Sequence, residues 1–343
     1  MENKIPTIKD IALQLKVSVS TVSRALSDHP GIGLRTKEQV QKLAKELNYI
    51  RNDKAISFKQ KKSFVIGVVL PYIREEFFSE AISGMEMAAI EHEYTILFGQ
   101  SYDNPETEIK VVEAMKKQRV DGLIISLSKQ TNKYDHLESL KQYDIPVVYF
   151  DRVPPFEAHK VFCNLYRGTI DMVGWLFSRG YKRISLVNGP AKLQATKERF
   201  KGYVEGLSKR KLKVDMSLVE STDLSKESTY DAVSKLLSLK VPPSAIISFN
   251  DYVHMDAVQY ALKQNIQVNK EIVFLSYANL PITNYTAYPP LVSIEQYPYG
   301  QGERAMEMII RILNMTNEQK SAENVYFTEE MPATLVMHTM PVL

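Results

Sequence analysis

The segment FVIGVVLP, residues 64–71, is a continuous apolar run that ends at a proline. A strand that is buried on both faces has such a continuous apolar sequence, whereas a strand with one solvent-exposed face alternates apolar and polar residues. Next along the chain come an amphipathic stretch over 78–92 and a second apolar run over 94–98. Strand, helix and strand in this order predict a parallel sheet covered by helices.

The same alternation continues through the rest of the chain and restarts near Val161. We therefore expect two doubly wound α/β lobes, each with its own mostly parallel sheet. Ligands of such sheets bind beyond the carboxyl ends of the strands. Further strands are expected over 122–127, 146–151, 183–187, 245–249 and 272–277, and further helices over 105–118, 166–178, 195–209 and 299–314.

The charges of the chain are unevenly distributed. Residues 1–62 hold 13 Lys and Arg and 6 Asp and Glu, a net charge of +7, so the other 281 residues carry −4 of the total of +3. A basic segment on a mildly acidic body is typical of a polyanion-binding module joined to a soluble sensor or enzyme. A solvated basic face without a partner would give the same count.

Three short helices are expected in this basic segment, with Thr7, Ser18 and Thr36 as their N-caps. Two helices joined by a tight turn and supported by a third form helix-turn-helix geometry. A small three-helix bundle in which Arg24 has a structural role fits the same periodicity. The expected helices span 7–15, 19–26 and 36–47.

The outward face of the second expected helix is small and polar, as a helix in a major groove requires. Arg24 is expected to bind the O6 and N7 atoms of a guanine, which is a base-reading contact. Thr21 and Ser23 are expected to hold phosphates, which position a protein without reading sequence.

The basic segment at the N-terminus, the head of the chain, closely resembles the DNA-binding part of the lactose-repressor (LacI/GalR) family of bacterial regulators. The resemblance is carried by the segments Thr7–Ala12, Val17–Leu26 and Leu47–Ile50, and above all by the run VSVSTVSR at 17–24. It implies that Val19 and Ser20 read bases. The DNA-binding residues that we predict are Thr7, Ser18, Val19, Ser20, Thr21, Ser23, Arg24, Asn52, Ala55 and Phe58.

The resemblance also implies a hinge helix after the head, which inserts a Leu into the minor groove of bound DNA. Asn52 and Ala55 match this pattern, whereas Arg51 replaces the usual Pro and Phe58 takes the Leu position. Phe is a known intercalating side chain, so the kinking role is retained as a hypothesis. The alternative is that Phe58 packs in a dimer interface.

Polar and aromatic side chains cluster just after the expected strands. A carboxylate and an Arg can bind adjacent hydroxyls, and an aromatic ring can stack on a sugar or base. Each residue alone also has a structural explanation, since strand-end Asp residues cap helices and helical Arg residues form surface ion pairs. The candidate ligand-binding residues are Tyr72, Phe77, Phe78, Asp151, Arg199, Asn250, Asp251 and Tyr277.

The body also resembles the sensor of the same family and, more distantly, periplasmic sugar-binding proteins. The segments that carry this resemblance are Phe150–Arg152, Gly180–Ile184, Arg199–Tyr203, Phe249–Asp251 and Pro289–Gln296. It implies that Asp151, Arg199 and Asn250 touch the effector. The acidic residue that often follows the strand-end Tyr is missing, because Ala278 and Asn279 follow Tyr277. This departure predicts an effector that is bulkier, less hydroxylated or anionic, compared with a plain hexose.

The predicted protein is thus a homodimeric, cytoplasmic transcription regulator. Repression is the favoured role, while activation and the direction of the effector response stay open at the level of the sequence. Its partners are double-stranded operator DNA and a small effector, a sugar or a derivative, with no membrane partner, cofactor or metal. The predicted domains are a helix-turn-helix domain (1–49), a hinge (50–62), an N-terminal lobe (63–162 with 295–324) and a C-terminal lobe (163–294 with 325–343).

The sequence argues against two other classes of protein. An enzyme is disfavoured because the sequence has no Gly-rich phosphate loop, nucleophile elbow or metal-binding His–Glu–His spacing. A periplasmic solute receptor would need a signal peptide, and the polar N-terminus does not read as one. Cys163 is the only cysteine, so the chain has no internal disulfide.

Overall fold

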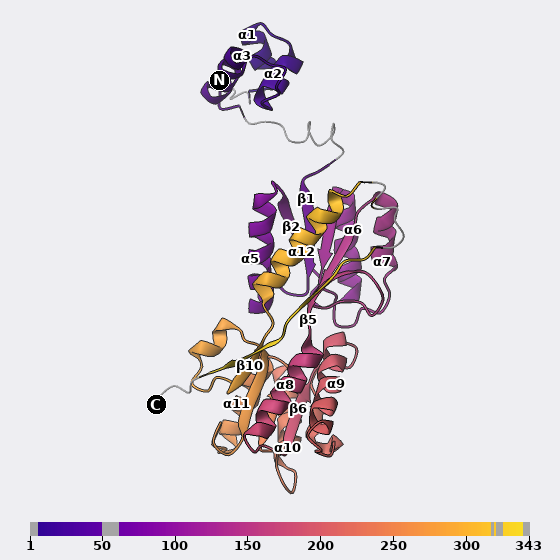
Figure 1. Cartoon of the computed structure of the whole chain (residues 1–343), viewed down its shortest axis with the longest axis vertical. Helices are drawn as coiled ribbons and strands as arrows, with labels where there is room; N and C mark the ends of the chain where they lie inside the picture. The colour runs from indigo at the N-terminus through magenta and orange to yellow at the C-terminus, as the bar shows by residue number, and fades with distance from the viewer. Residues whose placement is uncertain (1–5, 50–61, 317–318, 320–324, 339–343) are drawn as a thin grey trace. The chain divides into compact units, whose positions relative to one another are not determined.

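The computed structural model describes residues 6–49, 62–316, 319 and 325–338. Contacts within the chain divide it into two compact units, Met1–Ser63 and Phe64–Leu343. The described part of the first unit, which we call the head, contains short helices. The second unit, the body, contains two sheets with helices on their faces, as expected for two α/β lobes (Figure 1).

The helices of the head surround a small apolar core. α1 (Ile8–Leu15) begins as expected, because the Asp10 carboxylate accepts hydrogen bonds from the N–H and the hydroxyl of Thr7, at 2.8 and 2.6 Å. α2 (Val19–Leu26) also begins as expected, since the Ser18 hydroxyl accepts a first-turn backbone N–H at 3.0 Å. The core consists of Ile11, Ala12, Val22, Ala25, Val40 and Ala44.

The third helix of the head begins earlier than the sequence predicts. α3 (Leu34–Glu46) has Gly33 as its N-cap, and the Gly33 carbonyl accepts the N–H groups of Thr36 and Lys37 at 3.0 and 3.1 Å. The predicted N-cap, Thr36, therefore lies inside the first turn, and that prediction is wrong. Gly33 has the extended backbone of an N-cap, and glycine fills this position nearly as well as Thr.

The first lobe of the body is a six-stranded sheet in the order β11-β5-β4-β3-β1-β2, in which all the pairs are parallel. Its strands are β1 (Val65–Leu70), β2 (Thr95–Gln100), β3 (Gly122–Ile125), β4 (Val147–Phe150), β5 (His159–Cys163) and β11 (Thr328–Met331). Its helices are α5 (Glu76–Glu91), α6 (Pro105–Gln118), α7 (Asp135–Glu138), η1 (Ser139–Tyr143) and α12 (Pro298–Leu313).

The second lobe is a sheet in the order β12-β10-β9-β8-β6-β7, in which only the β10–β12 pair is antiparallel. Its strands are β6 (Ile184–Asn188), β7 (Val219–Ser221), β8 (Ala245–Ser248), β9 (Val273–Ala278), β10 (Val292–Glu295) and β12 (Thr334–Met337). Its helices are α8 (Leu165–Ser178), α9 (Gln194–Ser208), η2 (Met216–Leu218), α10 (Lys226–Leu237), α11 (Asp251–Lys263) and η3 (Pro281–Tyr285).

The strands and helices of the body that the sequence predicts by range begin and end within two residues of their expected bounds. The predicted assignment of 325–343 to the second lobe needs a correction. β11 pairs with β5 in the first sheet, and only β12 pairs with β10 in the second. The described end of the chain therefore contributes one edge strand to each sheet. β11 lies beside β5 at the edge of the first sheet, and β12 lies beside β10 at the edge of the second.

One face of the first sheet is covered by α5 and α12, which lie side by side in Figure 1. The two helices approach closely at Gly84 and Gly302. A Cβ at Gly84 would lie 2.1 Å from the Tyr299 carbonyl oxygen, and one at Gly302 would lie 1.9 Å from that of Ala81. Glycine is therefore required at this crossing.

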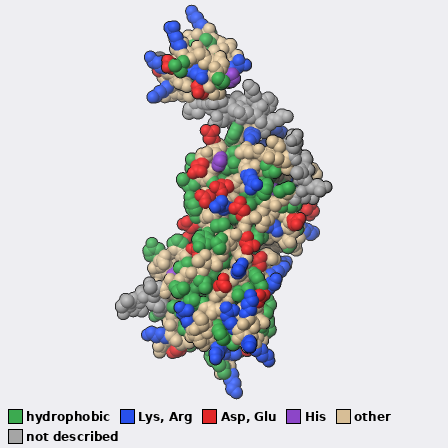
Figure 2. Space-filling model, viewed as in Figure 1, with side chains coloured by type: hydrophobic (Ala, Val, Ile, Leu, Met, Phe, Trp, Pro, Cys, Tyr) green, Lys and Arg blue, Asp and Glu red, His purple; other side chains and the backbone are tan. Residues whose placement is uncertain are grey.

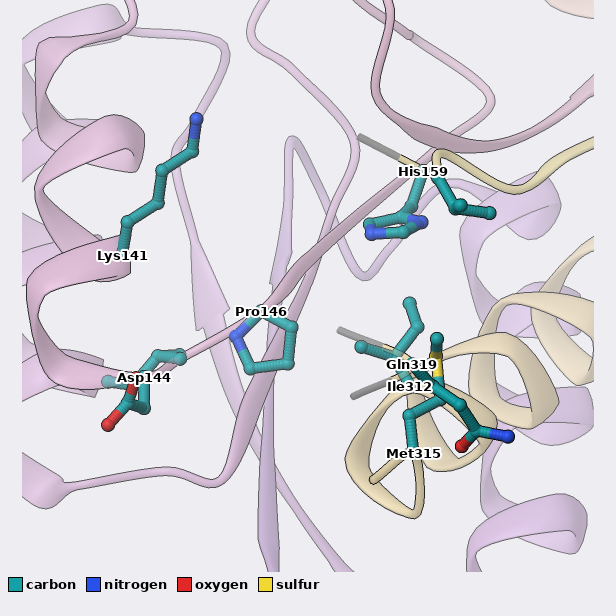
Figure 3. A pocket seen from close by; sticks show the side chains of 9 residues that line it. Lys141, Asp144, Pro146, His159, Ile312, Met315 and Gln319 are labelled. Atoms are coloured by element: carbon teal, nitrogen blue, oxygen red, sulfur yellow. The ribbon is translucent and has the colours of Figure 1, made fainter. Parts of the chain in front are cut away.

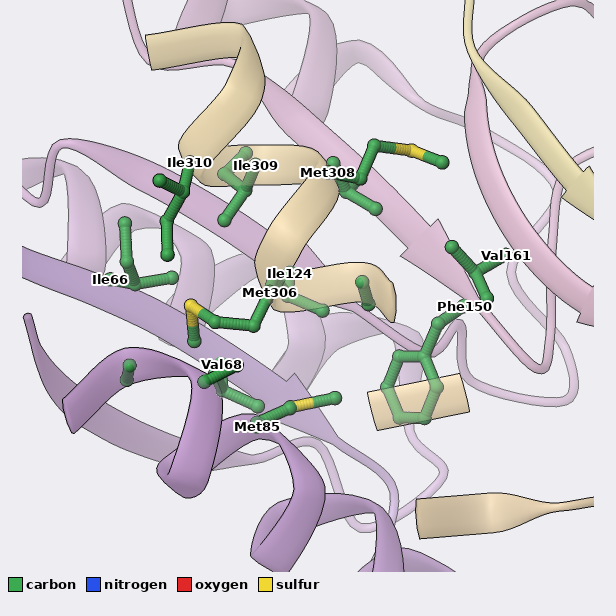
Figure 4. Packing of buried hydrophobic residues seen from close by; sticks show 14 of the residues in the cluster. Ile66, Val68, Met85, Ile124, Phe150, Val161, Met306, Met308, Ile309 and Ile310 are labelled. Atoms are coloured by element: carbon green, nitrogen blue, oxygen red, sulfur yellow. The ribbon is translucent and has the colours of Figure 1, made fainter. Parts of the chain in front are cut away.

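The core beneath these helices is built from buried hydrophobic residues (Figure 4). Met85 of α5 and Met306 and Ile309 of α12 point toward Val68 of β1 and Ile124 of β3. This packing fixes the start of α5, which faces the second lobe. No helix in the described part of the chain is long and apolar enough to cross a membrane.

Candidate functional site

The outward face of α2 presents the short polar side chains expected of a recognition helix. Val19, Ser20, Ser23 and Arg24 are exposed and Thr21 is half-buried, whereas the neighbouring Val22 and Ala25 are buried in the core of the head. The Ser18 hydroxyl contacts the hydroxyls of Ser20 and Thr21 at 2.7 and 2.8 Å. Lys and Arg side chains project from the surface of the head in Figure 2.

The remaining predicted DNA contacts divide into two groups. Thr7 is exposed at the start of α1, although its hydroxyl is already bonded to Asp10. Asn52, Ala55 and Phe58 of the predicted hinge lie outside the described residues.

A small cavity of about 70 Å³ lies between the two lobes of the body, where the carboxyl ends of strands from both sheets meet. Five predicted ligand residues line it: Phe77, Phe78, Asp151, Arg199 and Asn250. The other residues that line it are Glu75, Arg152, Leu193, Ala195, Phe249, Tyr252, Ala278, Leu280 and Gln296.

Arg199 of α9 has a specialised environment in this cavity. Its side chain is 97% buried, since only 3% of the residue is exposed. Its guanidinium lies between two rings, 3.9 Å from the centroid of Phe249 and 4.4 Å from that of Tyr277. The Nε and Nη1 atoms have no hydrogen-bond partner among the described residues. Burial lowers the pKa of Arg199, although a guanidinium remains protonated in proteins. Unused N–H groups at the cavity wall suit an oxygen of a bound ligand.

Two carboxyl groups face Arg199 across the cavity from the first lobe. Asp151 follows β4 in the left-handed backbone region, with φ of 57°, and Ser126 donates to it at 3.4 Å. Burial raises the pKa of Asp151 and of Glu75, against the opposing charge of Arg152. Carboxyl groups of this kind can bind ligand hydroxyls as acceptors or, when protonated, as donors.

Asn250 is positioned by its role as the N-cap of α11. Its Oδ1 accepts the N–H of Val253 at 2.9 Å, so its side-chain NH₂ is the group that remains to donate to a ligand. Asn250 thus has two roles at once: it caps α11 and it lines the cavity.

The structure does not bring Tyr72, Asp251 or Tyr277 to the cavity wall. The Tyr72 hydroxyl donates to the Tyr102 carbonyl at 3.1 Å. The fully buried Asp251 accepts the N–H of Leu280 at 2.7 Å and the hydroxyl of a serine in β9. Tyr277 is fully buried and does not line the cavity, whereas the next residue, Ala278, does. Asp251 and Tyr277 contact residues of the cavity wall, Leu280 and Arg199 respectively.

Sequence reasoning missed four polar residues that line the cavity: Glu75, Arg152, Tyr252 and Gln296. Each lies within two residues of a predicted site residue or inside a quoted motif. Their positions were thus indicated only by proximity. Arg152 is bonded to the buried Asp103, which fixes its guanidinium beside Asp151.

Two hydrogen bonds join the lobes at the mouth of the cavity, and we call them the latch. The Ile282 N–H donates to Glu76 Oε2 at 3.0 Å, and the Glu76 N–H donates to the Tyr252 hydroxyl at 3.4 Å. Glu76 is in the first turn of α5 in the first lobe, while Tyr252 and Ile282 belong to the second. The latch therefore connects the two lobes next to the cavity, which Tyr252 also lines.

A larger pocket of about 510 Å³ lies elsewhere in the first lobe, near the beginnings of β4 and β5 (Figure 3). Lys141, Pro146, His159 and Ile312 are among the residues that line it. It is at the amino ends of these strands, and ligands of α/β sheets bind at the carboxyl ends. We therefore do not assign the ligand to this pocket, although it is larger. The smaller cavity between the lobes lies at the carboxyl ends of the strands, where ligands of such sheets bind.

Two protein-family models match the sequence. "Bacterial regulatory proteins, lacI family" matches residues 7–52, and "Periplasmic binding proteins and sugar binding domain of LacI family" matches residues 63–335. The second match covers most of the chain and contains the cavity between the lobes. The chain belongs to the LacI family of bacterial regulators.

Curated LacI-family relatives match over nearly their whole length. The transcriptional repressor CytR of Escherichia coli is 29% identical over 304 residues, 89% of each protein. The ribose operon repressor of Bacillus subtilis is 29% identical over 330 residues, 96% of this chain and 97% of the relative. A structure of the Lac repressor dimer bound to operator has the same fold, with a TM-score of 0.84 at 21% identity, covering 99% of this chain and 100% of that one.

Proposed function

We propose that this LacI-family protein is a homodimeric repressor whose affinity for operator DNA is set by a small ligand in the cavity between its lobes. The observation that carries the proposal is the buried, ring-sandwiched guanidinium of Arg199, whose Nε and Nη1 lack partners among the described residues. Leaving buried donors unsatisfied costs free energy, and a ligand oxygen would remove this cost. Repression and operator binding are properties of the named relatives.

The DNA-binding part of the proposal rests on α2. Val19 and Ser20 are exposed at its beginning and Arg24 is exposed one turn later, which is the arrangement needed to reach base edges in a major groove. The basic charge of the head would supply salt-dependent attraction to phosphates. The preference for one DNA sequence would then depend on a few side chains of α2 that contact base edges.

The dimer in the proposal rests on apolar residues at the surface of the first lobe. Met87 and Ile90 of α5 are 51% and 68% exposed, and Leu97 on the neighbouring edge strand β2 is 36% exposed. Exposed large apolar side chains on adjacent elements mark protein–protein contacts. Ile90→Glu should dissociate the protein in sedimentation experiments. A monomeric wild-type protein would contradict this part.

Ligand control of DNA binding requires that the ligand distinguish two arrangements of the lobes. Lobe closure is a suitable coordinate, because the cavity is lined from both lobes and the latch joins them. The coupling must be reciprocal, so operator DNA must change the affinity for the ligand by the same factor as the ligand changes the affinity for DNA.

The experiment uses the full chain. Its operator is selected from random-sequence duplex DNA, and a panel of sugars, sugar acids, sugar phosphates and nucleosides is screened for compounds that raise the thermal unfolding midpoint. We expect an enriched near-palindromic sequence, and a stabilising compound that changes operator affinity. Failure to enrich any sequence would contradict the DNA-binding role, and a stabilising compound without effect on DNA affinity would contradict ligand control.

A further inference from the structure

A second hollow of about 340 Å³, which we call the basic groove, adjoins the cavity between the lobes. The two hollows share Arg152, Leu193 and Ala195 as lining residues, so they are neighbours. The basic groove is further lined by Leu127, Ser128, Lys129, Thr131, Asn132, Tyr134, Val153, Pro155, Lys192, Gln194 and Lys197.

The charges that line the basic groove are all positive. Lys129, Arg152, Lys192 and Lys197 line it, and no Asp or Glu does. Arg152 is bonded to Asp103, whereas the three lysines form no ion pair with any residue in the described part of the chain. Three lysines from both lobes, without an ion-pair partner among the described residues, therefore line one hollow, and their positive charges favour an anion there.

The backbone at the second-lobe side of the basic groove has the same preference. The 15-residue helix α9 begins at Gln194, and its N-cap is Leu193, which has no side-chain oxygen to accept the first-turn N–H groups. Free N–H groups at a helix N-terminus attract anions. Farther along the same helix, the almost fully buried Arg199 lines the adjoining cavity, and its Nε and Nη1 have no hydrogen-bond partner among the described residues.

The inner cavity has a different character. There the positive charges of Arg152 and Arg199 face the carboxyl groups of Glu75 and Asp151, and Phe77 is among the rings on the wall. Such a balanced, partly aromatic site suits an uncharged ring with hydroxyl or amide groups. One end of the composite site thus suits a neutral ring, and the other suits an anion.

We infer that the effector is a phosphate monoester of a sugar or nucleoside, with its ring in the inner cavity and its phosphate in the basic groove. The inference rests on the proposed function and specifies the class of its ligand. A neutral hexose would leave the three lysines of the groove without a partner. The phosphate would contact lysines of both lobes, Lys129 in the first and Lys192 and Lys197 in the second, and would thereby stabilise closure.

The test compares each neutral compound with its phosphate monoester, for example ribose with ribose 5-phosphate and cytidine with cytidine 5′-monophosphate, by calorimetric titration of the full chain. We expect one monoester to bind at least about tenfold more tightly than its neutral partner. The variant K129Q/K192Q/K197Q should abolish this advantage and leave the affinity of the neutral partner unchanged. The matched control K182Q/K213Q/K240Q removes three exposed lysines that do not line either hollow, and it should preserve the advantage.

Each other outcome overturns the inference in a recognisable way. Neutral ligands that bind as tightly as their monoesters, or a monoester advantage that survives K129Q/K192Q/K197Q, would overturn the phosphate assignment and leave the proposed function standing. Inorganic phosphate that tightens binding of a neutral compound would assign the basic groove to a separate ion. Absence of binding by every compound, charged or neutral, would contradict the proposed function as well.

Discussion

The guanidinium of Arg199 lies over the ring of Phe249, with 3.9 Å between the guanidinium carbon and the ring centroid. Tyr277 covers the opposite side at 4.4 Å, and its hydroxyl is held by the Thr169 hydroxyl at 2.6 Å. The two rings hold the cation in place without using its N–H groups. An arginine fixed in advance loses little side-chain entropy when a ligand binds, so its hydrogen bonds contribute more to affinity.

Arg199→Met should abolish the response to the effector and leave operator binding intact. The substitution keeps an apolar stem between the rings and removes the donors that we assign to the ligand. Nε and Nη1 have no hydrogen-bond partner among the described residues, so the main loss is the contact of the cation with the two rings, and we expect the free energy of unfolding without ligand to fall by about 1–2 kcal/mol. Thermal midpoints with and without ligand check this, and a retained ligand-induced shift would refute the assignment.

Arg24→Ala should weaken binding to the selected operator by about 1–3 kcal/mol and reduce the preference over unrelated DNA. Arg24 is exposed on the outward face of α2, where a guanidinium can reach a guanine. The matched control is Arg35→Ala, which removes an equal charge from the first turn of α3. It should change both affinities by a similar factor. Fluorescence anisotropy at fixed salt measures them, and an unchanged specificity ratio in Arg24→Ala would contradict base reading.

Glu76→Ala should weaken effector binding about tenfold by removing the shorter hydrogen bond of the latch, to the Ile282 N–H at 3.0 Å. The lost bond destabilises the closed arrangement, so most of the effect is expected in the dissociation rate. Tyr252→Phe removes the acceptor of the 3.4 Å bond and also a hydroxyl from a residue that lines the cavity, so its effect combines the latch with the cavity wall. Stopped-flow measurements of dissociation rank the variants, and equal rates for all three proteins would exclude a role for the latch.

Gly84→Ala should lower the free energy of unfolding by about 1–3 kcal/mol or more. The new methyl group would lie 2.1 Å from the Tyr299 carbonyl oxygen, and backbone atoms cannot move aside without separating α5 from α12. Gly300→Ala is the control on the same helix pair, because its nearest neighbour is the flexible end of Met331 at 3.3 Å. Urea unfolding compares the two, and equal stability would mean that the helices tolerate separation.

His254 should make the body less stable as the pH falls below about 6.5. Burial lowers the pKa of His254 to about 4, and its Nε2 is 3.0 Å from the Tyr288 carbonyl oxygen. Between about 6.5 and 4 the unfolded chain binds a proton at this position and the folded chain does not, so acid favours unfolding.

The matching variant is His254→Gln, which cannot titrate. From pH 6.5 to 5.5 the wild type should lose about 1 kcal/mol of unfolding free energy more than the variant does. Urea unfolding at both pH values measures this difference between proteins. The same pH dependence in both would show that His254 does not contribute.

The head and the order of elements in the body were predictable because their signals are local. The caps Thr7 and Ser18 are read from two or three neighbouring residues, and the strand at 64–70 from its own apolar run. Thr36 failed because a better-placed Gly33 preceded it, so even a local signal can have a competitor.

The division of 325–338 between the lobes and the make-up of the cavity were not predictable in the same way. β11 and β12 are adjacent in sequence but pair with strands of different sheets, and only the open sheet edges decide this. Whether Tyr277 or Ala278 faces the ligand depends on which side of β9 meets the other lobe.

By itself, the sequence determined the two α/β lobes, the recognition helix and the family, because hydrophobic periodicity and short motifs record local geometry. Only the tertiary structure decided that Glu75, Arg152 and Tyr252 share a cavity with Arg199, and that a groove lined by three lysines lies next to it. Hydrophobic periodicity indicates which side of a helix or strand is buried. It does not indicate which distant helix or strand packs against that side, and the ligand site is formed by residues from such distant elements.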